Sequence, residues 1–290
     1  MRALFVTSEG QEPATVMSGW SYWNEPCRRV TFGITGAKND VKILEAAKEF
    51  SPDIIFYIGG AQGAGLPTIE TLRALRNIAK SISLVCDATD HPWHPALIEY
   101  KENECFDLQV GLDGSLEAPV DMNTVTPLDP RIYDTKPSPA RDIRCGFSGQ
   151  QSTKTVREML ISILESKGLI MVRPRTSALY GDYAMFLRHC EMVFNVGLTG
   201  TAERLHIKGR VIESGLAGAA LLEMEGSPAD KWFPRKSIFF YRTVEDAEKI
   251  IRHASKNEVA DKAAMLSEIV RTKYNPQKIY GEMLERVGLK

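Results

Sequence analysis

The sequence predicts an α/β protein made of two doubly wound halves, each with a mostly parallel sheet that helices cover on both faces. Short apolar runs alternate along the chain with longer segments of helical period, and this alternation is typical of βαβ units. A proline-rich stretch, residues 119–141, breaks the alternation once, and the pattern restarts after it. The 290 residues are enough for two domains that each bury a core.

In the first half, apolar runs bounded by turn residues predict strands, and segments of helical spacing predict helices. Asn39 or Asp40 can cap the first helix, and Pro67 suits the first turn of the second. The expected strands are residues 3–6, 29–34, 53–58, 83–86 and 107–110, and the expected helices are residues 41–50 and 67–79.

The second half repeats this layout after the prolines. The expected strands are residues 144–147, 169–172, 192–196, 219–222 and 237–241, and the expected helices are residues 153–167, 182–189 and 205–217, with three more helices to follow. We therefore expect an N-terminal domain at residues 1–136 and a C-terminal domain at residues 137–272. The helix of residues 273–290 is a candidate for packing back on the N-terminal domain. Ligands of such sheets bind beyond the carboxyl ends of the strands, so we expect the site in a cleft at the domain boundary.

The composition argues against several classes of protein. The net charge is −1, from 36 basic and 37 acidic residues, which disfavours the broad basic surface of a nucleic-acid binder. Five cysteines without a CxxC pair disfavour a disulfide framework or a zinc site. No run approaches about 20 apolar residues, and the N-terminus lacks the apolar region of a signal peptide. We expect a cytoplasmic protein without a membrane span.

The turn after the first strand of the second half is the first candidate site. Ser148, Gly149 and Gln150 stand between that strand and the next helix. Small residues at such a turn expose backbone N–H groups, and the helix N-terminus adds partial positive charge, so an anion can bind there. The turn is a phosphate cradle in this interpretation, and an ordinary strand-to-helix connection in the alternative.

Residues 197–218 are the second candidate. A glycine- and threonine-rich loop with Thr199 and Gly200 leads into an apolar helix, and Arg204, Lys208, Gly209, Arg210 and Glu213 lie around its start. Cations beside a helix N-terminus suit a diphosphate, and a carboxylate one turn later can accept hydrogen bonds from a ribose diol. The alternative is a solvated charged face. The small residues at 214–220 argue against it, because they suit close packing against a neighbour or a ligand.

The same residues carry a resemblance to a known family. The helix and the strand after it read Arg210-Val-Ile-Glu213-Ser-Gly-Leu-Ala-Gly218-Ala-Ala-Leu-Leu-Glu223. Upstream stand Asp129-Pro-Arg-Ile-Tyr133 and residues 141–149, and downstream stand residues 237–246. Over residues 126–255 the sequence resembles the CgeB-like (spore maturation protein-like) glycosyltransferases of the GT-B superfamily.

The resemblance implies two Rossmann-like domains that face each other across a cleft, and a retaining hexosyl- or pentosyltransferase. It implies a nucleotide-sugar co-substrate, such as a UDP- or GDP-sugar, with no bound metal and no other cofactor. Glu213 would hold the ribose, Arg210 with Ser148 and Gly149 would face the diphosphate, and Arg173 would lie near the base. Lys208 and Arg210 would stabilise the departing diphosphate. Glu203 stands two residues away from where a related family pattern has its first acid.

A polar loop after the fourth strand of the first half is the candidate acceptor site. Asp87, Asp90 or His91 could deprotonate an acceptor hydroxyl, and Trp93 and His94 could contact the acceptor. A metal site is disfavoured, because neighbouring residues on a proline-interrupted loop rarely converge on one ion, and a polar surface loop is the plain alternative. Trp20 could add an aromatic platform, or it could pack in the core.

Three functions stay open at this stage. The first is glycosyl transfer to a glycan, small molecule or protein; a DNA base is a disfavoured acceptor because the chain carries almost no net charge. The second is a nucleotide-sugar epimerase or hydrolase on the same fold. The third is a non-catalytic protein that keeps the nucleotide pocket.

Overall fold

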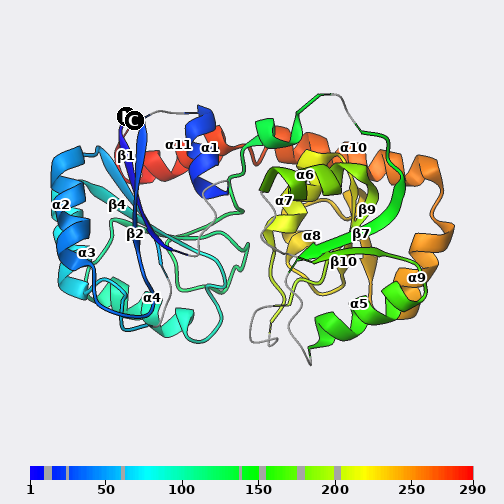
Figure 1. The fold of residues 1–290 in the computed structure, drawn as a ribbon, viewed down its shortest axis with the longest axis horizontal. Coiled ribbons are helices and arrows are strands. Elements are labelled where there is room, and N and C mark those ends of the chain that lie inside the picture. Colours follow the sequence, from blue (N-terminus) through cyan, green and yellow to red (C-terminus); the bar gives the residue numbers. More distant parts are fainter. Residues whose placement is uncertain are drawn as a thin grey trace. The chain divides into compact units, whose positions relative to one another are not determined.

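The computed structural model describes residues 1–9, 15–23, 26–59, 63–136, 139–149, 155–174, 180–198 and 204–289. The chain forms two compact units (Figure 1). Unit 1 comprises Met1–Asp129 and Pro276–Lys290, and unit 2 comprises Pro130–Asn275. The α/β fold class expected from the sequence is confirmed, because each unit holds a parallel sheet with helices packed on it.

Unit 1 is built on a six-stranded sheet in which every neighbouring pair is parallel. In hydrogen-bonded order the strands are β2 (Cys27–Phe32), β1 (Ala3–Ser8), β3 (Ile54–Ile58), β4 (Lys80–Val85), β5 (Leu108–Gly111) and β6 (Met122–Asn123). The chain runs from β1 to one side and then returns past it, so strand order reverses between β1 and β3. Such a reversal is the usual place for a ligand in an open α/β sheet.

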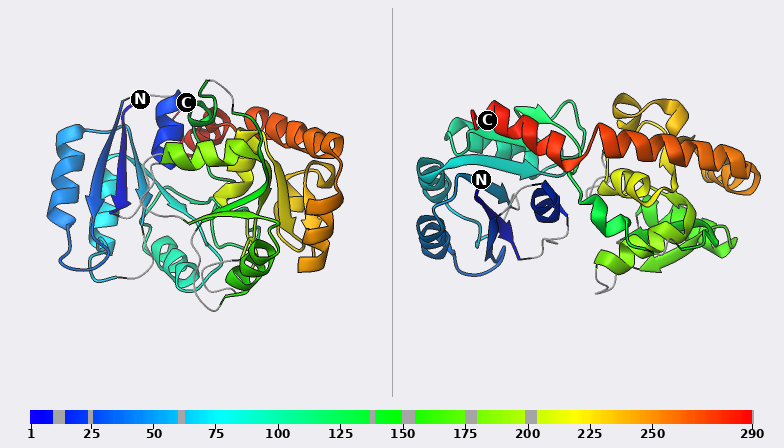
Figure 2. Two further views of the ribbon diagram at one scale, coloured as in Figure 1. Left: turned by 45° about the vertical axis from the view of Figure 1, so that its right-hand side comes forward. Right: turned by 90° about the horizontal axis from the view of Figure 1, so that it is seen from above.

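The two faces of the first sheet are covered by different helices (Figures 1 and 2). Leu4 and Val6 of β1 point to a cluster with α2 (Asp40–Phe50), α3 (Ile69–Ile78) and α4 (Trp93–Glu102). Phe5 points the other way, to α1 (Val16–Trp23) and α11 (Pro276–Arg286), where Trp20 and Tyr280 contact each other. Alternate residues of a strand face opposite sides, so one strand serves both cores.

Unit 2 contains a five-stranded parallel sheet with the same kind of order. Its strands are β11 (Phe239–Tyr241), β10 (Ala220–Met224), β9 (Cys190–Phe194), β7 (Ile143–Gly149) and β8 (Met171–Pro174). Strand order reverses between β7 and β9. The carboxyl ends of these two strands are therefore the expected ligand position of this unit.

The helices of unit 2 also lie on two faces. Phe147 and Phe194 point into a core with α5 (Val156–Ser166), α9 (Val244–His253) and the first part of α10 (Lys256–Thr272). Gly146, next to Phe147, faces α6 (Tyr180–His189) instead, where a Cβ would lie 2.9 Å from the Phe186 ring. The helix α7 (Gly209–Ala217) packs on α6 and α10, and α8 (Ala229–Trp232) follows β10.

The boundary between the units falls seven residues before the one expected at residue 136. The short 3₁₀ helix Pro130–Tyr133 belongs to unit 2, where it contacts α6 and α7. The Tyr133 hydroxyl lies 2.9 Å from that of Tyr180, and Asp134 pairs with Arg271 at 2.8 Å. These contacts hold the end of the proline-rich stretch on the second unit. Among the described residues, no helix is both long and apolar enough to cross a bilayer.

Candidate functional site

Arg210, in the first turn of α7, joins the carboxyl ends of the two strands where strand order reverses in unit 2. Its Nη2 donates to the Ser148 carbonyl oxygen of β7 at 2.6 Å, and its Nη1 donates to Oδ1 of Asn195, just after β9, at 2.5 Å. The guanidinium also lies over the Phe147 ring, 4.7 Å from its centroid. A fixed cation therefore stands at the position where sheets of this order bind ligands.

Gly149 is a position where only glycine fits beside this cation. A Cβ there would lie 2.4 Å from Nη2 of Arg210. Ser148, Gly149 and Arg210, which the resemblance placed together at the diphosphate, contact one another in the structure. Gln150, predicted with them, lies outside the described residues, as do Thr199 and Gly200.

Glu213, one turn further along α7, is buried and engaged by two tyrosines of α6. Its two carboxylate oxygens accept hydrogen bonds from the hydroxyls of Tyr180, at 2.9 Å, and Tyr183, at 2.5 Å. Burial, and then the Glu213 charge, raise the pKa of both hydroxyls well above the ordinary value, and at Tyr183 the Arg210 guanidinium opposes the shift. Tyr183 therefore lies beside both residues that the sequence singled out. A carboxylate has about four acceptor positions, so two bonds do not saturate it.

Glu223, a buried acid beside Asn195, ends the motif that carries the family resemblance, but no role was predicted for it. Glu223 of β10 has no exposed surface, and its Oε2 accepts from Nδ2 of Asn195 at 2.5 Å. Burial raises the pKa of Glu223 to about 7, against hydrogen bonds from Asn195, the Met224 N–H and Ser227. Both residues stand at the carboxyl end of an apolar strand, and a polar residue at that position is the signal that could have found them.

The other predicted donor residues lie around α7 and α6. Leu198 and Leu205, which precedes α7, form an isolated antiparallel β-bridge. Arg204 is exposed, and Lys208, half-buried, occupies the N-cap position, with Gly209 as the first helical residue. Arg173 donates to the Asp182 carbonyl at 2.8 Å, so its guanidinium faces α6.

The small residues of α7 have a packing role. A Cβ at Gly215 would lie 2.6 Å from Cγ2 of Val270 on α10, so α7 and α10 approach closely there. The hydroxyl of Ser214 donates to the Arg210 carbonyl within the helix. The pattern at 214–218 thus reflects the contact with a neighbouring helix that the sequence allowed as one of two explanations.

In unit 1 the predicted acceptor loop is a tight turn that leads into α4. Asp87 has a positive φ of 67° and is half-buried, and its carbonyl accepts from the Asp90 N–H at 2.9 Å. Asp90 is buried, whereas His91 is exposed. Trp93 and His94, both half-buried, begin α4, and Trp93 packs on the cluster around Val85, Ala88 and Leu97.

Trp20 is a core residue in this structure. It has no exposed surface, and its indole contacts the rings of Phe5, Phe56 and Tyr280. Its expected role as an acceptor platform is therefore not supported, because a fully buried ring has no surface to offer. The alternative interpretation, core packing, accounts for it.

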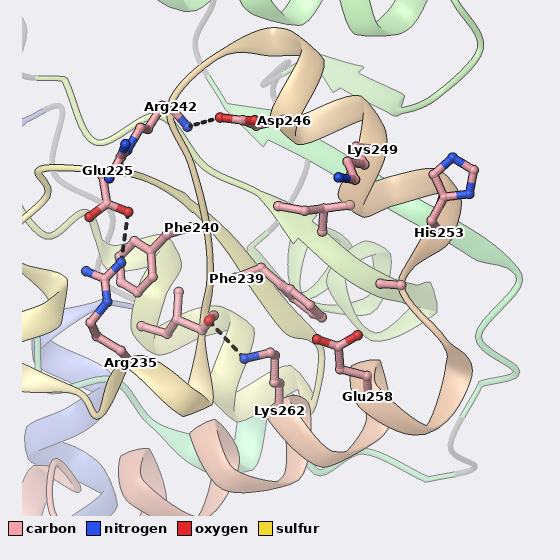
Figure 3. A pocket seen from close by; sticks show the side chains of 13 residues that line it. Glu225, Arg235, Phe239, Phe240, Arg242, Asp246, Lys249, His253, Glu258 and Lys262 are labelled. Carbon is pink, nitrogen blue, oxygen red and sulfur yellow. Dashed lines mark hydrogen bonds and ion pairs between the residues drawn. The ribbon is translucent and has the colours of Figure 1, made fainter.

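A hollow in unit 2 lies elsewhere, along the outer side of β11 (Figure 3). It is a groove of about 670 Å³ between β11, α9 and α10. Arg242, Lys249 and His253 stand on its rim, together with the acids Asp246 and Glu258. The groove is two strands away from β9, and its mixed charges do not converge as a ligand site requires. No three His, Cys, Asp or Glu side chains within the described ranges are grouped to hold a metal ion.

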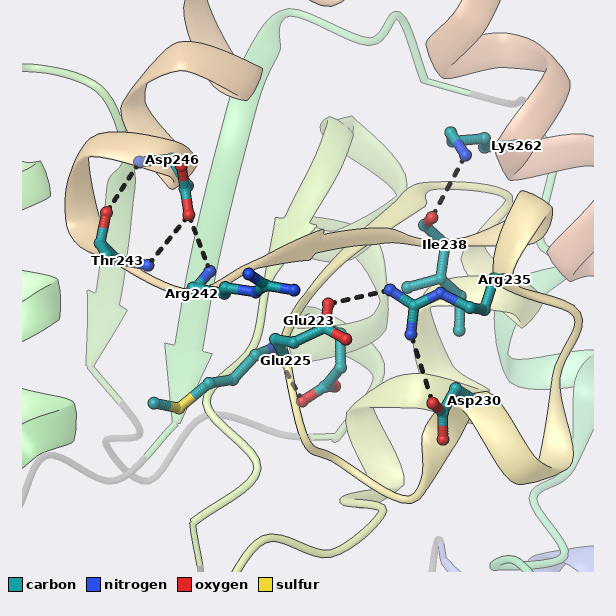
Figure 4. Close-up of polar contacts among 10 residues, drawn as sticks. Glu223, Glu225, Asp230, Arg235, Ile238, Arg242, Thr243, Asp246 and Lys262 are labelled. Carbon is teal, nitrogen blue, oxygen red and sulfur yellow. Dashed lines mark hydrogen bonds and ion pairs between the residues drawn. The ribbon is translucent and has the colours of Figure 1, made fainter.

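The groove instead shows how the edge of the sheet is closed (Figure 4). The Tyr241 carbonyl accepts from the Glu225 N–H, so the backbone N–H and C=O groups of Tyr241 point toward β10. Those of residues 238, 240 and 242 therefore point away from the sheet, at its open edge. Lys262 of α10 donates to the outward Ile238 carbonyl at 3.2 Å, and the outward Arg242 N–H donates to Asp246 at 3.2 Å. Side chains therefore take two of the positions that a further strand would use.

The chain resembles known proteins in its structure and not in its sequence. No protein-family model matches the chain, and no curated protein matches its sequence. HepE of Anabaena, solved with UDP and glucose, is 12% identical over 98% of each chain, with a TM-score of 0.69. An alpha-glucosyltransferase solved with UDP-glucose and DNA containing an abasic site is 10% identical over 99% of each chain, with a TM-score of 0.63. An alpha1,3-fucosyltransferase is 11% identical, with a TM-score of 0.53, over 99% of this chain and 90% of that one.

These similarities extend over both units of the chain and rest on fold, since the identities are low. The narrower resemblance to the CgeB-like family stays a prediction. The two Rossmann-like units have the GT-B fold that solved glycosyltransferases share.

Proposed function

We propose that this protein is a glycosyltransferase that binds a nucleoside-diphosphate sugar in unit 2, at the carboxyl ends of β7 and β9. The observation that supports the proposal most directly is the position of Arg210, whose guanidinium bridges Ser148 and Asn195 where the strand order reverses. A guanidinium has five N–H donors, and the two bonds to the protein leave donors for phosphate oxygens.

The proposed roles follow the charge that develops during transfer. When the bond between the sugar and the diphosphate breaks, negative charge grows on the leaving group, and Arg210 and Lys208 stabilise it together with the N-terminus of α7. Glu213 holds the ribose, and Arg173 lies near the base. Two tyrosines of α6 orient the Glu213 carboxylate.

The identity of the donor is proposed from the fold neighbours. HepE and the alpha-glucosyltransferase were solved with UDP or UDP-glucose, which favours a uridine nucleotide here. The acceptor hydroxyl is activated from the loop of Asp87, Asp90 and His91 in unit 1, and the reaction retains the anomeric configuration. A net charge of −1 favours a glycan, a small molecule or a protein over DNA as the acceptor.

The first test is calorimetric titration of the protein with UDP and with GDP. We expect UDP to bind, Glu213→Ala and Arg210→Ala to weaken binding at least about tenfold, and Arg242→Ala to leave it unchanged. Arg242 is the matched control, because it is an exposed arginine of the same unit. If neither nucleotide binds the folded protein, the proposal fails.

Product analysis then separates the kinds of enzyme. With UDP-glucose and a panel of acceptors, glycosyl transfer gives a new glycoside and UDP. Release of UDP with free sugar and no acceptor dependence indicates a hydrolase, and a changed sugar on intact UDP indicates an epimerase. Binding without turnover of any donor indicates a non-catalytic protein.

A further inference from the structure

Behind Arg210 lies a line of buried polar groups that the proposed transfer reaction does not use directly. Glu223 and Asn195 both have no exposed surface. The line runs from the Glu223 carboxylate to the Asn195 amide at 2.5 Å, and from that amide to the Arg210 guanidinium, also at 2.5 Å. Buried polar groups that hydrogen-bond to one another in series restrict one another's orientation.

The backbone of Asn195 is already fixed, so only its side-chain amide is left to orient. Its N–H donates to the Leu222 carbonyl at 2.9 Å, and its carbonyl accepts from the Tyr241 hydroxyl at 2.8 Å. The amide can face Arg210 with its oxygen or with its NH₂ group. Only the oxygen can accept from a guanidinium, which has donors alone.

Glu223 determines which of these two orientations is stable. Its Oε2 accepts from Asn195, while its Oε1 accepts from the Met224 backbone N–H at 3.1 Å. Both contacts require an acceptor, and an ionised carboxylate is the one side chain of this size that accepts at both ends. The NH₂ group of Asn195 is therefore drawn toward Glu223, and its oxygen is left facing Arg210.

We propose that Glu223 is a positioning residue, which orients the Asn195 amide and thereby holds the Arg210 guanidinium at the nucleotide site. This proposal rests on the proposed function for the ligand that Arg210 meets. Glu223 touches no ligand itself, and acts through one intervening side chain.

A nearly isosteric substitution exposes this role. In Glu223→Gln the amide oxygen can accept from Met224 or from Asn195, and its NH₂ group then opposes a donor at the other contact. Rotation of Asn195 relieves the opposition but turns its NH₂ group toward Arg210. When the glutamine oxygen accepts from the Met224 N–H, which the backbone holds in place, this rotation deprives the guanidinium of its acceptor without any change in side-chain volume.

Exchanging the carboxylate and the amide between positions 223 and 195 restores the hydrogen bonds that connect position 223 to Arg210. In the double variant Asn195→Asp/Glu223→Gln, the introduced glutamine accepts from the Met224 N–H and donates to the introduced aspartate, whose other oxygen accepts from Arg210. The total charge equals that of the natural pair. A role limited to filling space predicts no such rescue.

The experiment is titration with UDP at about pH 8, where Glu223 is ionised. We expect Glu223→Gln to weaken UDP binding about tenfold, and the double variant to recover affinity to within about threefold of the natural protein. Glu225→Gln is the matched control, because Glu225 is a surface residue paired with Arg235, and it should change nothing. Thermal unfolding checks that each variant is folded. If Glu223→Gln does not fold, the double variant alone decides.

Full affinity in Glu223→Gln, or a double variant that is folded but no better than Glu223→Gln, would overturn the proposal. A second readout needs no ligand, namely ¹⁵N NMR of the arginine side chains. Rotation of the Arg210 guanidinium should be slow in the natural protein and the double variant, and fast in Glu223→Gln. If UDP and GDP both fail to bind the natural protein, the proposed function fails, and this NMR comparison still decides the role of Glu223.

Discussion

A Cβ atom at position 149 would lie 2.4 Å from Nη2 of Arg210, so the guanidinium occupies the space that any other residue there would need. The last residue of β7 thus packs directly against an arginine in the first turn of α7. The contact gives a means of displacing the cation without removing it.

We expect Gly149→Ala to push the Arg210 guanidinium off the Ser148 carbonyl and to weaken UDP binding about tenfold. The reason is steric, since the added methyl group meets the cation and all charges of the unit are otherwise kept. Calorimetric titration measures the effect. Gly281→Ala in α11 is the control, because a Cβ there meets nothing within 4 Å. Unchanged affinity in Gly149→Ala would mean that Arg210 does not meet the nucleotide.

The Glu213 carboxylate should stabilise the fold as well as bind the nucleotide. Glu213→Ala removes the carboxylate acceptor of both hydroxyls and leaves the Tyr180 hydroxyl only that of Tyr133. We expect a loss of roughly 2–4 kcal/mol in the free energy of unfolding. Urea denaturation measures it. Glu213→Gln should cost less in the natural protein, and should become neutral or stabilising when both tyrosines are phenylalanine, because it then removes an unpaired buried charge. Additive effects would show that these three side chains do not interact.

The free energy of unfolding should depend on pH because Glu223 titrates. Its pKa is raised to about 7 in the folded state, from the ordinary 4.5, so the folded protein holds the proton more tightly than the unfolded chain does. The resulting stability is present below about pH 4.5 and is lost as the pH rises through about 7. Glu223→Gln does not titrate. From pH 4.5 to 8, we expect the natural protein to lose on the order of 3 kcal/mol relative to this variant. Urea denaturation of both proteins across this range tests it, and a constant difference would contradict it.

Asp87→Asn tests the proposed acceptor site most directly. Asparagine tolerates a positive φ, so Asp87→Asn keeps the turn while removing the base. We expect turnover to fall about a hundredfold with UDP affinity unchanged. Initial rates with a saturating donor measure this, and His91→Ala shows whether the exposed histidine contributes instead. If neither variant slows turnover, neither Asp87 nor His91 is the base, and Asp90 is the one candidate of this loop that is left.

The C-terminal helix should be part of the core of unit 1. Trp20 contacts Tyr280, and the Tyr280 hydroxyl donates to the Val16 carbonyl at 2.6 Å. We expect Trp20→Ala to cost about 3–5 kcal/mol and Tyr280→Phe about 1–2 kcal/mol. Tyr22 lies on the exposed side of α1, the helix that holds Trp20, so Tyr22→Ala should cost little stability. Thermal unfolding followed by circular dichroism makes the comparison, and equal losses at positions 20 and 22 would contradict the packing described.

The sequence predicted the architecture well because hydrophobic period is a local property. The strands and most helices follow from it, whereas the grouping of Arg210 with Ser148 and Gly149 came from the family resemblance. No helix was predicted where α4 lies, because the polar residues 87–94 at its start hide the helical pattern that follows.

The contacts that were missed depend on strand order. Asn195 and Glu223 stand 28 residues apart and meet only because β9 and β10 are neighbours in register. The spacing of Tyr180 and Tyr183 indicates one apolar face of a helix, α6. Their partner Glu213 lies on another helix, α7. A single sequence shows which residues end a strand, but it does not show which strands lie side by side.

The closed edge of β11 has a consequence for the protein before it reaches its final state. A parallel sheet forms slowly, and while it forms an open strand can recruit a strand from another chain. Lys262 and Asp246 come from helices that follow β11 in the sequence, so they reach the edge only after α9 and α10 have packed. Self-association should therefore threaten the newly made chain most until about residue 262 has been synthesised, and recede once the last helices have docked.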